Sequence, residues 1–468
     1  MPKTVAENDR FGGVEDNMQI IVVGCGTVGA TLTEYLSKEG HNVTVIDSKA
    51  SRLTHVTNSY DVMGVVGNGA SYGVQMEAGI EDADLLIAVT SSDEVNLLCC
   101  LFAKKAVNCH TIARVRDPIY SHEVNYIKDE LGMALVINPE YAAATAIARL
   151  LKFPSAIEVD TFAKGRVELS KFRLESDNVL VGAMLKDIQS ILKCDVLICT
   201  VERGDEVIIP DGNFQLREKD EISVVASAKN IVKFFKKMGM ATQRVKDTLI
   251  VGGGSTTYYL AKQLLAMGID VKIIERDRAR CDELCELLPE ASIVHGDGTE
   301  RDVLMEEGIE RAQSFVSMTN LDEENVMLSL FAKSVSKAKL VTRVHRMAYD
   351  ELLDTLDIGS IVYPRLTIAE DIVRYVRAMS NSLGSNVETL HKLNDGRVEA
   401  LEFWIQEDSP VVGVPLMQLN LKHNLLVACI NRQGKIITPR GQDMIQVGDT
   451  VIVITTNTGL HDIKDILR

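Results

Sequence analysis

Apolar and polar residues follow two different periods along the first part of the chain. Runs rich in β-branched residues, such as QIIVVG, NVTVID, DLLIAVT and TIARV, have the length of buried strands. Between these runs lie segments of about 10 to 15 residues with the apolar spacing of amphipathic helices. Strands that alternate with helices form parallel sheets covered by helices. Residues 18–138 are therefore predicted to form one doubly wound α/β domain.

The pattern changes after Pro139. A helical segment, EYAAATAIARLLKF, leads to Pro154, and strands such as VELSKFRL and EISVVAS then follow, separated by turns rich in Gly and Asp. This arrangement predicts a linker helix and a small α+β domain over residues 139–238. Residues 1–17 contain no apolar run of the kind found in secretion signals, and we expect them to be a flexible tail.

Nearly the whole pattern occurs twice. Residues 20–47 align without a gap with residues 248–275, so that GCG of the first segment matches GGG of the second. Further along, GRVELSKFRLESDNVLVGAML resembles GRVEALEFWIQEDSPVVGVPL. A repeat period of more than about 200 residues indicates domain duplication and not a solenoid.

The duplication predicts the fold class. We expect two Rossmann-like domains with doubly wound parallel sheets, each followed by a small α+β domain. The second α/β domain is predicted at residues 246–366, and the second linker helix and α+β domain at residues 367–468. Several domains also agree with the length of 468 residues, which exceeds one ordinary hydrophobic core.

A glycine-rich turn joins the first predicted strand to the first predicted helix. It consists of Gly24, Cys25, Gly26, Thr27, Val28 and Gly29. In such a motif the first glycine permits a tight bend, the second lets a diphosphate approach the backbone N–H groups, and the third lets the helix pack against the strand. Asp47 ends the second strand, where a carboxylate accepts hydrogen bonds from ribose. The motif predicts a dinucleotide site, and the alternative is a structural turn without a ligand.

The chemistry of the motif limits the ligand without fixing it. The charge of Asp47 favours NAD(H) over NADP(H), although Lys49 and Arg52 lie nearby in the sequence and weaken that preference. ATP and ADP carry the same ribose and phosphate groups. NAD(H) and ATP/ADP are therefore both candidate ligands.

The second repeat retains part of this motif. Gly252, Gly254 and Glu275 occupy the matching positions, but Thr257 replaces the third glycine. The second turn either binds another nucleotide or is a degenerate copy kept as scaffold.

Each repeat has another glycine-rich turn after its third strand. GNGA contains Gly67 and Asn68, and GDGT contains Asp297. Such turns can admit the edge of an adenine or a ribose, or they can be purely structural.

Charged residues recur at the ends of later strands. Arg114 in ARVRDP and Arg343 in TRVHRM lie where open α/β sheets bind ligands, so each can pair with a phosphate or with a protein carboxylate. The acidic pairs at 93–94 and 322–323 begin predicted helices. Their charge stabilises a helix start, or alternatively marks a ligand or cation site.

Composition excludes several classes of partner. The chain has 50 Lys and Arg against 66 Asp and Glu, and its net charge of -16 disfavours nucleic acids and anionic membranes. No apolar run reaches the roughly 20 residues that span a bilayer. The nine cysteines show no paired framework, which fits a reducing cytoplasm. No metal site is predicted.

Hydride chemistry requires an acid–base group in a substrate domain. The α+β domains are small, no set of histidines repeats at matched positions, and HExxH, GxSxG and P-loop lysine patterns are absent from the sequence. We therefore predict no catalytic residues and no enzymatic activity.

The order GCGTVG, Asp47, GNGA, AVTSSDEVN and ARVRDP, followed by a small β-rich domain and then repeated, resembles the RCK (regulator of potassium conductance) domain family in the tandem form of TrkA subunits. The resemblance covers residues 18–468. It implies a peripheral cytoplasmic protein that forms a homo-oligomer, a tetramer ring, beneath a TrkH- or TrkG-type membrane potassium channel. There it would gate potassium flux in response to bound NAD(H) or ATP/ADP.

The resemblance also implies roles for individual positions. The phosphates and the ribose would be held by Gly24, Gly26, Gly29 and Asp47. The adenine would be flanked by Gly67 and Thr90, and a phosphate would be approached by Arg114. The matching positions of the second repeat are Gly252, Gly254, Glu275 and Arg343. Two rival functions are a nucleotide-independent scaffold for a membrane partner and an NAD-dependent oxidoreductase.

Overall fold

The computed structural model describes residues 17–107, 109–117, 120, 124–204, 206–239, 245–345, 353, 356, 358–381, 387–393, 396–406, 409–457, 459–460 and 462–468. The chain divides into two compact units, Met1–Val115 with Glu123–Val136 and Arg116–His122 with Ile137–Arg468. Among the described residues, no helix is both long enough and apolar enough to cross a membrane.

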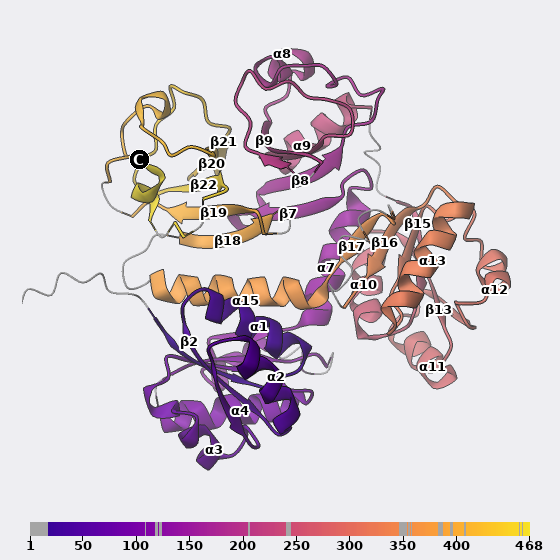
Figure 1. Cartoon of the computed structure of the whole chain (residues 1–468). Coiled ribbons are helices and arrows are strands. Elements are labelled where there is room, and N and C mark those ends of the chain that lie inside the picture. The colour runs from indigo at the N-terminus through magenta and orange to yellow at the C-terminus, as the bar shows by residue number, and fades with distance from the viewer. Residues whose placement is uncertain are drawn as a thin grey trace, which may run out of the picture. The chain divides into compact units, whose positions relative to one another are not determined.

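The N-terminal sheet has six strands in the order β3-β2-β1-β4-β5-β6. Figure 1 draws this part of the chain in indigo and purple. Its strands are β1 (Gln19–Val23), β2 (Asn42–Asp47), β3 (Met63–Val66), β4 (Leu85–Ala88), β5 (His110–Arg114) and β6 (Leu135–Ile137). The accompanying helices are α1 (Thr27–Lys38), α2 (Ala50–Ser59), α3 (Tyr72–Glu77), η1 (Ile80–Asp82), α4 (Asp93–Ala106) and α6 (Val124–Glu130). The pairs among β1 to β5 are parallel. The strand order reverses between β1 and β4, the place where open α/β sheets form a ligand crevice.

A second six-stranded sheet repeats this order as β14-β13-β12-β15-β16-β17, and its strands are parallel. The strands are β12 (Asp247–Val251), β13 (Asp270–Glu275), β14 (Ser292–His295), β15 (Ser314–Ser317), β16 (Lys339–Arg343) and β17 (Ser360–Val362). The helices are α10 (Ser255–Ala266), α11 (Arg278–Leu287), α12 (Arg301–Glu306) and α13 (Asp322–Val335).

Apolar residues on both faces of β12 explain why helices cover both faces of the second α/β sheet. Ile250 packs in a cluster that includes Leu260 of α10 and Leu284 of α11. Leu249 and its next-but-one neighbour Val251 pack in a different cluster with residues of α12 and α13. Successive side chains of a strand point to opposite faces, so a continuously apolar strand needs a helical layer on each side.

Each α/β sheet is followed by a linker helix and a five-stranded antiparallel sheet. The first set comprises α7 (Pro139–Lys152), β7 (Glu158–Phe162), η2 (Ala163–Gly165), β8 (Val167–Arg173), η3 (Leu185–Asp187), α8 (Ile188–Leu192), β9 (Leu197–Arg203), β10 (Glu206–Ile208), β11 (Glu221–Ser227) and α9 (Ala228–Lys237). The second comprises α15 (Pro364–Asn381), β18 (Val387–Leu393), β19 (Val398–Trp404), η4 (Leu416–Gln418), β20 (Leu425–Arg432), β21 (Lys435–Ile437), β22 (Asp449–Thr455) and η5 (Ile463–Ile466).

The two antiparallel sheets share one topology, since the order β10-β9-β11-β8-β7 corresponds strand by strand to β21-β20-β22-β19-β18. They also share a hydrophobic cluster, which combines residues such as Leu169 and Cys199 with Ala400 and Cys429. The predicted fold class, two Rossmann-like sheets each followed by a small α+β domain, is confirmed.

Candidate functional site

The first glycine turn lies between β1 and α1, at the point where the strand order of its sheet reverses. Gly24 has φ of +101°, a backbone conformation that favours glycine. A Cβ there would lie 2.9 Å from the backbone N of Thr90, which follows β4 closely. A Cβ on Gly29 would collide with the carbonyl oxygen of Gly24. The local backbone therefore requires glycine at both positions.

Gly26 leaves the start of α1 open. It has extended backbone angles, φ -78° and ψ -169°, and no side chain caps the helix. A Cβ on Gly26 would meet no atom of the described residues within 4 Å. The helix, which begins with Thr27 and Val28, therefore presents uncapped N–H groups next to open space. Such a helix start favours phosphate through both hydrogen bonding and the helix dipole.

Asp47, at the end of β2, is held against the turn. It is only 6% exposed; its Oδ2 accepts a hydrogen bond of 2.7 Å from the N–H of Cys25 and its Oδ1 one of 2.8 Å from Lys49. The guanidinium of Arg52 lies 3.5 Å from Oδ2. A carboxylate accepts about four hydrogen bonds, so capacity remains for a ribose hydroxyl. Burial, together with the charge of Asp47, raises the pKa of the Cys25 thiol.

In the turn after β3, contacts within the protein account for Gly67 and Asn68. A Cβ on Gly67 would lie 2.7 Å from Cγ2 of Val74. Oδ1 of Asn68 accepts a hydrogen bond of 3.0 Å from the N–H of Ala70, which stabilises the turn itself. The role of Gly67 and Asn68 beside a ligand stays a prediction.

Asn96, which the sequence analysis did not identify, connects the ends of two strands. This buried side chain accepts hydrogen bonds from the N–H of Thr90 (2.8 Å) and from its hydroxyl (2.7 Å). Its Nδ2 donates to the carbonyl oxygen of Arg114 at 2.9 Å. Asn96 thus holds two predicted site residues, Thr90 and Arg114, at the same edge of the sheet. In both repeats an asparagine follows the acidic pair at the same spacing, in DEVN and DEEN, but this recurrence indicates only the duplication.

The first two glycines of the second turn have the same conformations as those of the first, although Thr257 replaces the third glycine. Gly252 has φ of +103°, and Gly254 precedes α10 with φ -68° and ψ -178° and no side-chain cap. A Cβ on Gly254 would also have 4 Å of open space around it, as far as the described part of the chain extends. The hydroxyl of Thr257 donates a hydrogen bond of 2.5 Å to the carbonyl oxygen of Gly252. Because a Cβ on Gly29 would collide with the carbonyl oxygen of Gly24, the start of α10 must lie differently against its turn, while the first two glycines keep their conformations.

Glu275 repeats the contacts of Asp47 with a longer side chain. Its Oε2 accepts a hydrogen bond of 2.6 Å from the N–H of Gly253, and its Oε1 one of 2.7 Å from Asp277. Nε of Arg280 donates to the carbonyl oxygen of Gly253 at 2.7 Å. Both repeats therefore place a carboxylate on the backbone of the turn, with an arginine beside it.

Asp297, predicted from GDGT, bonds within its own turn. Its Oδ1 accepts from the N–H of Thr299 at 2.9 Å and from the Thr299 hydroxyl at 2.7 Å. These hydrogen bonds hold the pKa of Asp297 below its ordinary value. A ligand role for Asp297 stays a prediction.

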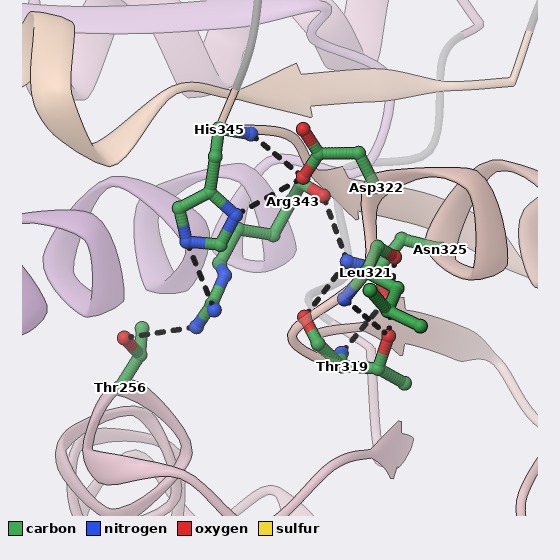
Figure 2. Close-up of polar contacts among 7 residues, drawn as sticks. All are labelled: Thr256, Thr319, Leu321, Asp322, Asn325, Arg343 and His345. Atoms are coloured by element: carbon green, nitrogen blue, oxygen red, sulfur yellow. Dashed lines mark hydrogen bonds and ion pairs between the residues drawn. The ribbon is translucent and has the colours of Figure 1, made fainter. Parts of the chain in front are cut away.

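Figure 2 shows the polar cluster at the end of β16, where Arg343, His345 and Asp322 point toward one another. Nη1 of Arg343 lies 3.5 Å from the hydroxyl of Thr256, the second residue of α10, and Nη2 lies 3.1 Å from Nε2 of His345. Oδ1 of Asp322 accepts from the His345 N–H at 2.9 Å and lies 3.0 Å from its Nδ1. Arg343 is a residue that the sequence predicts for the site, whereas His345 is not.

Arg343 is buried, and a hydrogen bond holds its backbone in place. The backbone carbonyl oxygen of Arg343 accepts a hydrogen bond of 3.0 Å from Nδ2 of Asn325, the counterpart of Asn96. The residue is only 8% exposed. Burial lowers the pKa of Arg343, and the charges of Glu140 and Asp322 oppose that shift. The result is a cation at the start of α10 in a place with little water.

Family models match both repeats. The TrkA-N domain matches residues 20–139 and 248–364, and the TrkA-C domain matches residues 169–239 and 400–468. The chain is 30% identical over 459 residues to Trk system potassium uptake protein TrkA homolog 2 of Methanosarcina mazei, covering 96% of this chain and 100% of that protein. It is also 30% identical to Trk system potassium uptake protein TrkA of Halomonas elongata, covering 96% and 98%.

Two solved structures have a similar fold. The GsuK channel bound to NAD aligns with a TM-score of 0.63 and 16% identity, covering 96% of this chain and 79% of that one. The GsuK RCK domain aligns with a TM-score of 0.62 and 17% identity, covering 95% and 93%.

Proposed function

The chain belongs to the TrkA family, and from this premise we propose that it is the nucleotide-binding regulatory subunit of a Trk-type potassium uptake system. The family assignment supports a regulatory role in potassium uptake. The nucleotide, the membrane partner and the gating step are the specific parts of the proposal.

One observation carries the nucleotide part: each repeat holds a carboxylate on the backbone of a glycine turn, beside an uncapped helix start. The helix start suits a diphosphate, and Asp47 or Glu275 suits the ribose hydroxyls. NAD(H) is the first ligand to test because the GsuK channel, which shares the fold, is described as bound to NAD. ATP and ADP offer the same ribose and phosphates and are the alternative ligands.

Both turns are proposed to bind. Gly254 has the same extended conformation and the same open space as Gly26. The second turn also has Arg343 at the start of α10, and this residue can pair with a phosphate. The proposed ligand residues are therefore Gly24, Gly26, Thr27, Val28, Gly29, Asp47, Gly67, Asn68, Thr90 and Arg114, with Gly252, Gly254, Glu275, Asp297 and Arg343.

Gating is proposed to follow from a difference in nucleotide affinity between two conformations of a homotetramer ring. A ligand that binds both conformations equally cannot shift their populations. The ring would lie on the cytoplasmic side of a TrkH- or TrkG-type potassium channel, as a peripheral protein without enzymatic activity of its own.

The binding step is tested with two charge substitutions, Gly26→Asp and Gly254→Asp. Aspartate is a good N-cap residue and the space beside each glycine is open, so each variant should fold. Its carboxylate should occupy the place of the phosphate and repel it. Calorimetric titration with NAD, NADH, ATP and ADP should lose one site in each variant and both sites in the double variant. Ser227→Asp, at the start of α9, is the control and should keep every site.

The gating step is tested by potassium flux through the reconstituted membrane partner. The nucleotide response should be lost in the double variant and retained in Ser227→Asp. If flux depends on the protein but not on any nucleotide, and the double variant behaves as the wild type does, the scaffold function replaces this proposal.

A further inference from the structure

The buried cation beside the second turn, Arg343, has more hydrogen-bond donors than its contacts with described residues occupy. A guanidinium carries five N–H donors and no acceptor. Among the described residues, Arg343 makes one contact of 3.5 Å to Thr256 and one of 3.1 Å to His345, and its buried Nε has no hydrogen-bond partner. No carboxylate in that part of the chain bonds directly to its side chain at the start of α10. An anion at the uncapped helix start would satisfy both the helix and this guanidinium.

The position of His345 between two charged groups determines which nitrogen carries its proton. Because the guanidinium can only donate, Nε2 of His345 must accept from Arg343 and cannot be protonated. The hydrogen on Nδ1 then points to Oδ1 of Asp322, 3.0 Å away. In this arrangement the imidazole is neutral.

Among the residues that the structure describes, the charged groups around this imidazole come from three elements. Asp322 at the start of α13 bonds to it directly, Arg343 of β16 occupies its other nitrogen, and Glu140 of α7 acts through its charge on Arg343. Protonating His345 here would break the contact with Arg343 and place a second cation beside it. A phosphate that bonds to Arg343 would remove both obstacles, because Nη2 turns to the phosphate and Nε2 of His345 becomes available.

We propose that binding of a diphosphate nucleotide at the second turn is coupled to uptake of one proton by His345. The phosphate takes Arg343 as its partner, the proton binds Nε2 of His345, and the resulting imidazolium lies between Asp322 and the bound anion. The side chain of His345 is 42% exposed, so the proton comes from solvent. By linkage, a proton that binding takes up must also strengthen binding as the pH falls.

The coupling belongs to the second repeat. Arg116 occupies the position of His345 in the first repeat, and an arginine does not titrate near neutral pH. The first turn should therefore bind nucleotide without proton uptake. This inference rests on the proposed nucleotide function and assigns a pH dependence to one of its two sites.

NAD is the probe, because its diphosphate stays fully ionised near neutral pH. The second turn is observed alone in Gly26→Asp and the first turn alone in Gly254→Asp. Calorimetry in two phosphate-free buffers with different ionisation enthalpies gives the number of protons taken up. In Gly26→Asp we expect uptake approaching one proton, and affinity about tenfold tighter at about pH 6 than at about pH 8. In Gly254→Asp both effects should be absent.

Adding His345→Gln to Gly26→Asp removes the titrating group but keeps an acceptor for Arg343. NAD should still bind, with no proton uptake and a pH dependence of less than about twofold. Asp322→Asn should reduce the uptake, since the imidazolium loses its anionic partner. Proton uptake that persists in His345→Gln, or a pH-independent second site, would overturn the inference and leave the nucleotide function intact. Absence of NAD, NADH, ATP and ADP binding to the wild type would instead overturn the proposed function.

Discussion

The first two glycines of the two turns have nearly the same backbone angles, whereas the side chains around them differ. Gly24 and Gly252 have φ of +101° and +103°, and the residue before each helix is extended in both repeats. The third position, however, is glycine in one repeat and Thr257 in the other. The comparison shows that the first two glycines and the contact from the acid to the backbone are kept while the third position differs. The helix start must lie differently against the turn in the second repeat, because a Cβ on Gly29 would collide with the carbonyl oxygen of Gly24.

Two neighbouring residues differ together between the repeats: the acid, and the middle residue of the turn, which lies between its first and second glycines. Asp47 is paired with Cys25, whereas the longer Glu275 is paired with Gly253. A Cβ on Gly253 would lie 2.9 Å from Oε2 of Glu275, so the additional methylene of glutamate occupies space that Cys25 has in the first repeat. The two repeats thus make the same contact from the acid to the backbone with two different side-chain pairs.

The largest effect on stability is expected when threonine, the residue at the third position of the second turn, replaces Gly29 at the third position of the first turn. Gly29→Thr brings a Cβ onto the carbonyl oxygen of Gly24, so the turn must shift. We expect a loss of about 2 to 4 kcal/mol in the free energy of unfolding, measured from the urea midpoint of the first transition. Gly26→Thr is the control, because its space is open and threonine is an acceptable N-cap residue. Equal stability of the two variants would show that the first turn tolerates threonine as the second does.

A double-mutant cycle tests whether the acid and the middle residue compensate. Gly253→Cys places a Cβ 2.8 Å from Cδ1 of Leu284 and 2.9 Å from Glu275, and should destabilise the protein by about 1 to 3 kcal/mol. Adding Glu275→Asp shortens the acid and should recover a large part of this loss. Strictly additive changes in the urea midpoint would contradict the compensation.

The sequence predicted the backbone of these sites better than their side-chain contacts. Strand and helix periods gave the fold class, because burial on both faces of a strand such as β12 leaves a direct apolar pattern. Asn96 and His345 were missed because their roles depend on strand ends that meet only after folding. The prediction for Thr257 treated the loss of glycine as a loss of packing. It did not foresee that the hydroxyl would bond to Gly252.

The smallest effect is expected for the reverse exchange, Thr257→Gly. This variant removes the hydrogen bond of 2.5 Å to Gly252 and introduces glycine into the first turn of α10. A hydrogen bond of this kind contributes about 1 kcal/mol, and glycine within a helix costs up to about 1 kcal/mol, so the total loss should stay near 1 to 2 kcal/mol. The backbone conformation that would bind a diphosphate is set by Gly252 and Gly254, which the variant retains. NAD affinity at the second turn should therefore change by less than about threefold in a calorimetric titration of Thr257→Gly in the Gly26→Asp background. A loss of affinity much larger than this would mean that the hydroxyl of Thr257 holds the helix start in its binding conformation, and the third position would then matter for the ligand in both repeats.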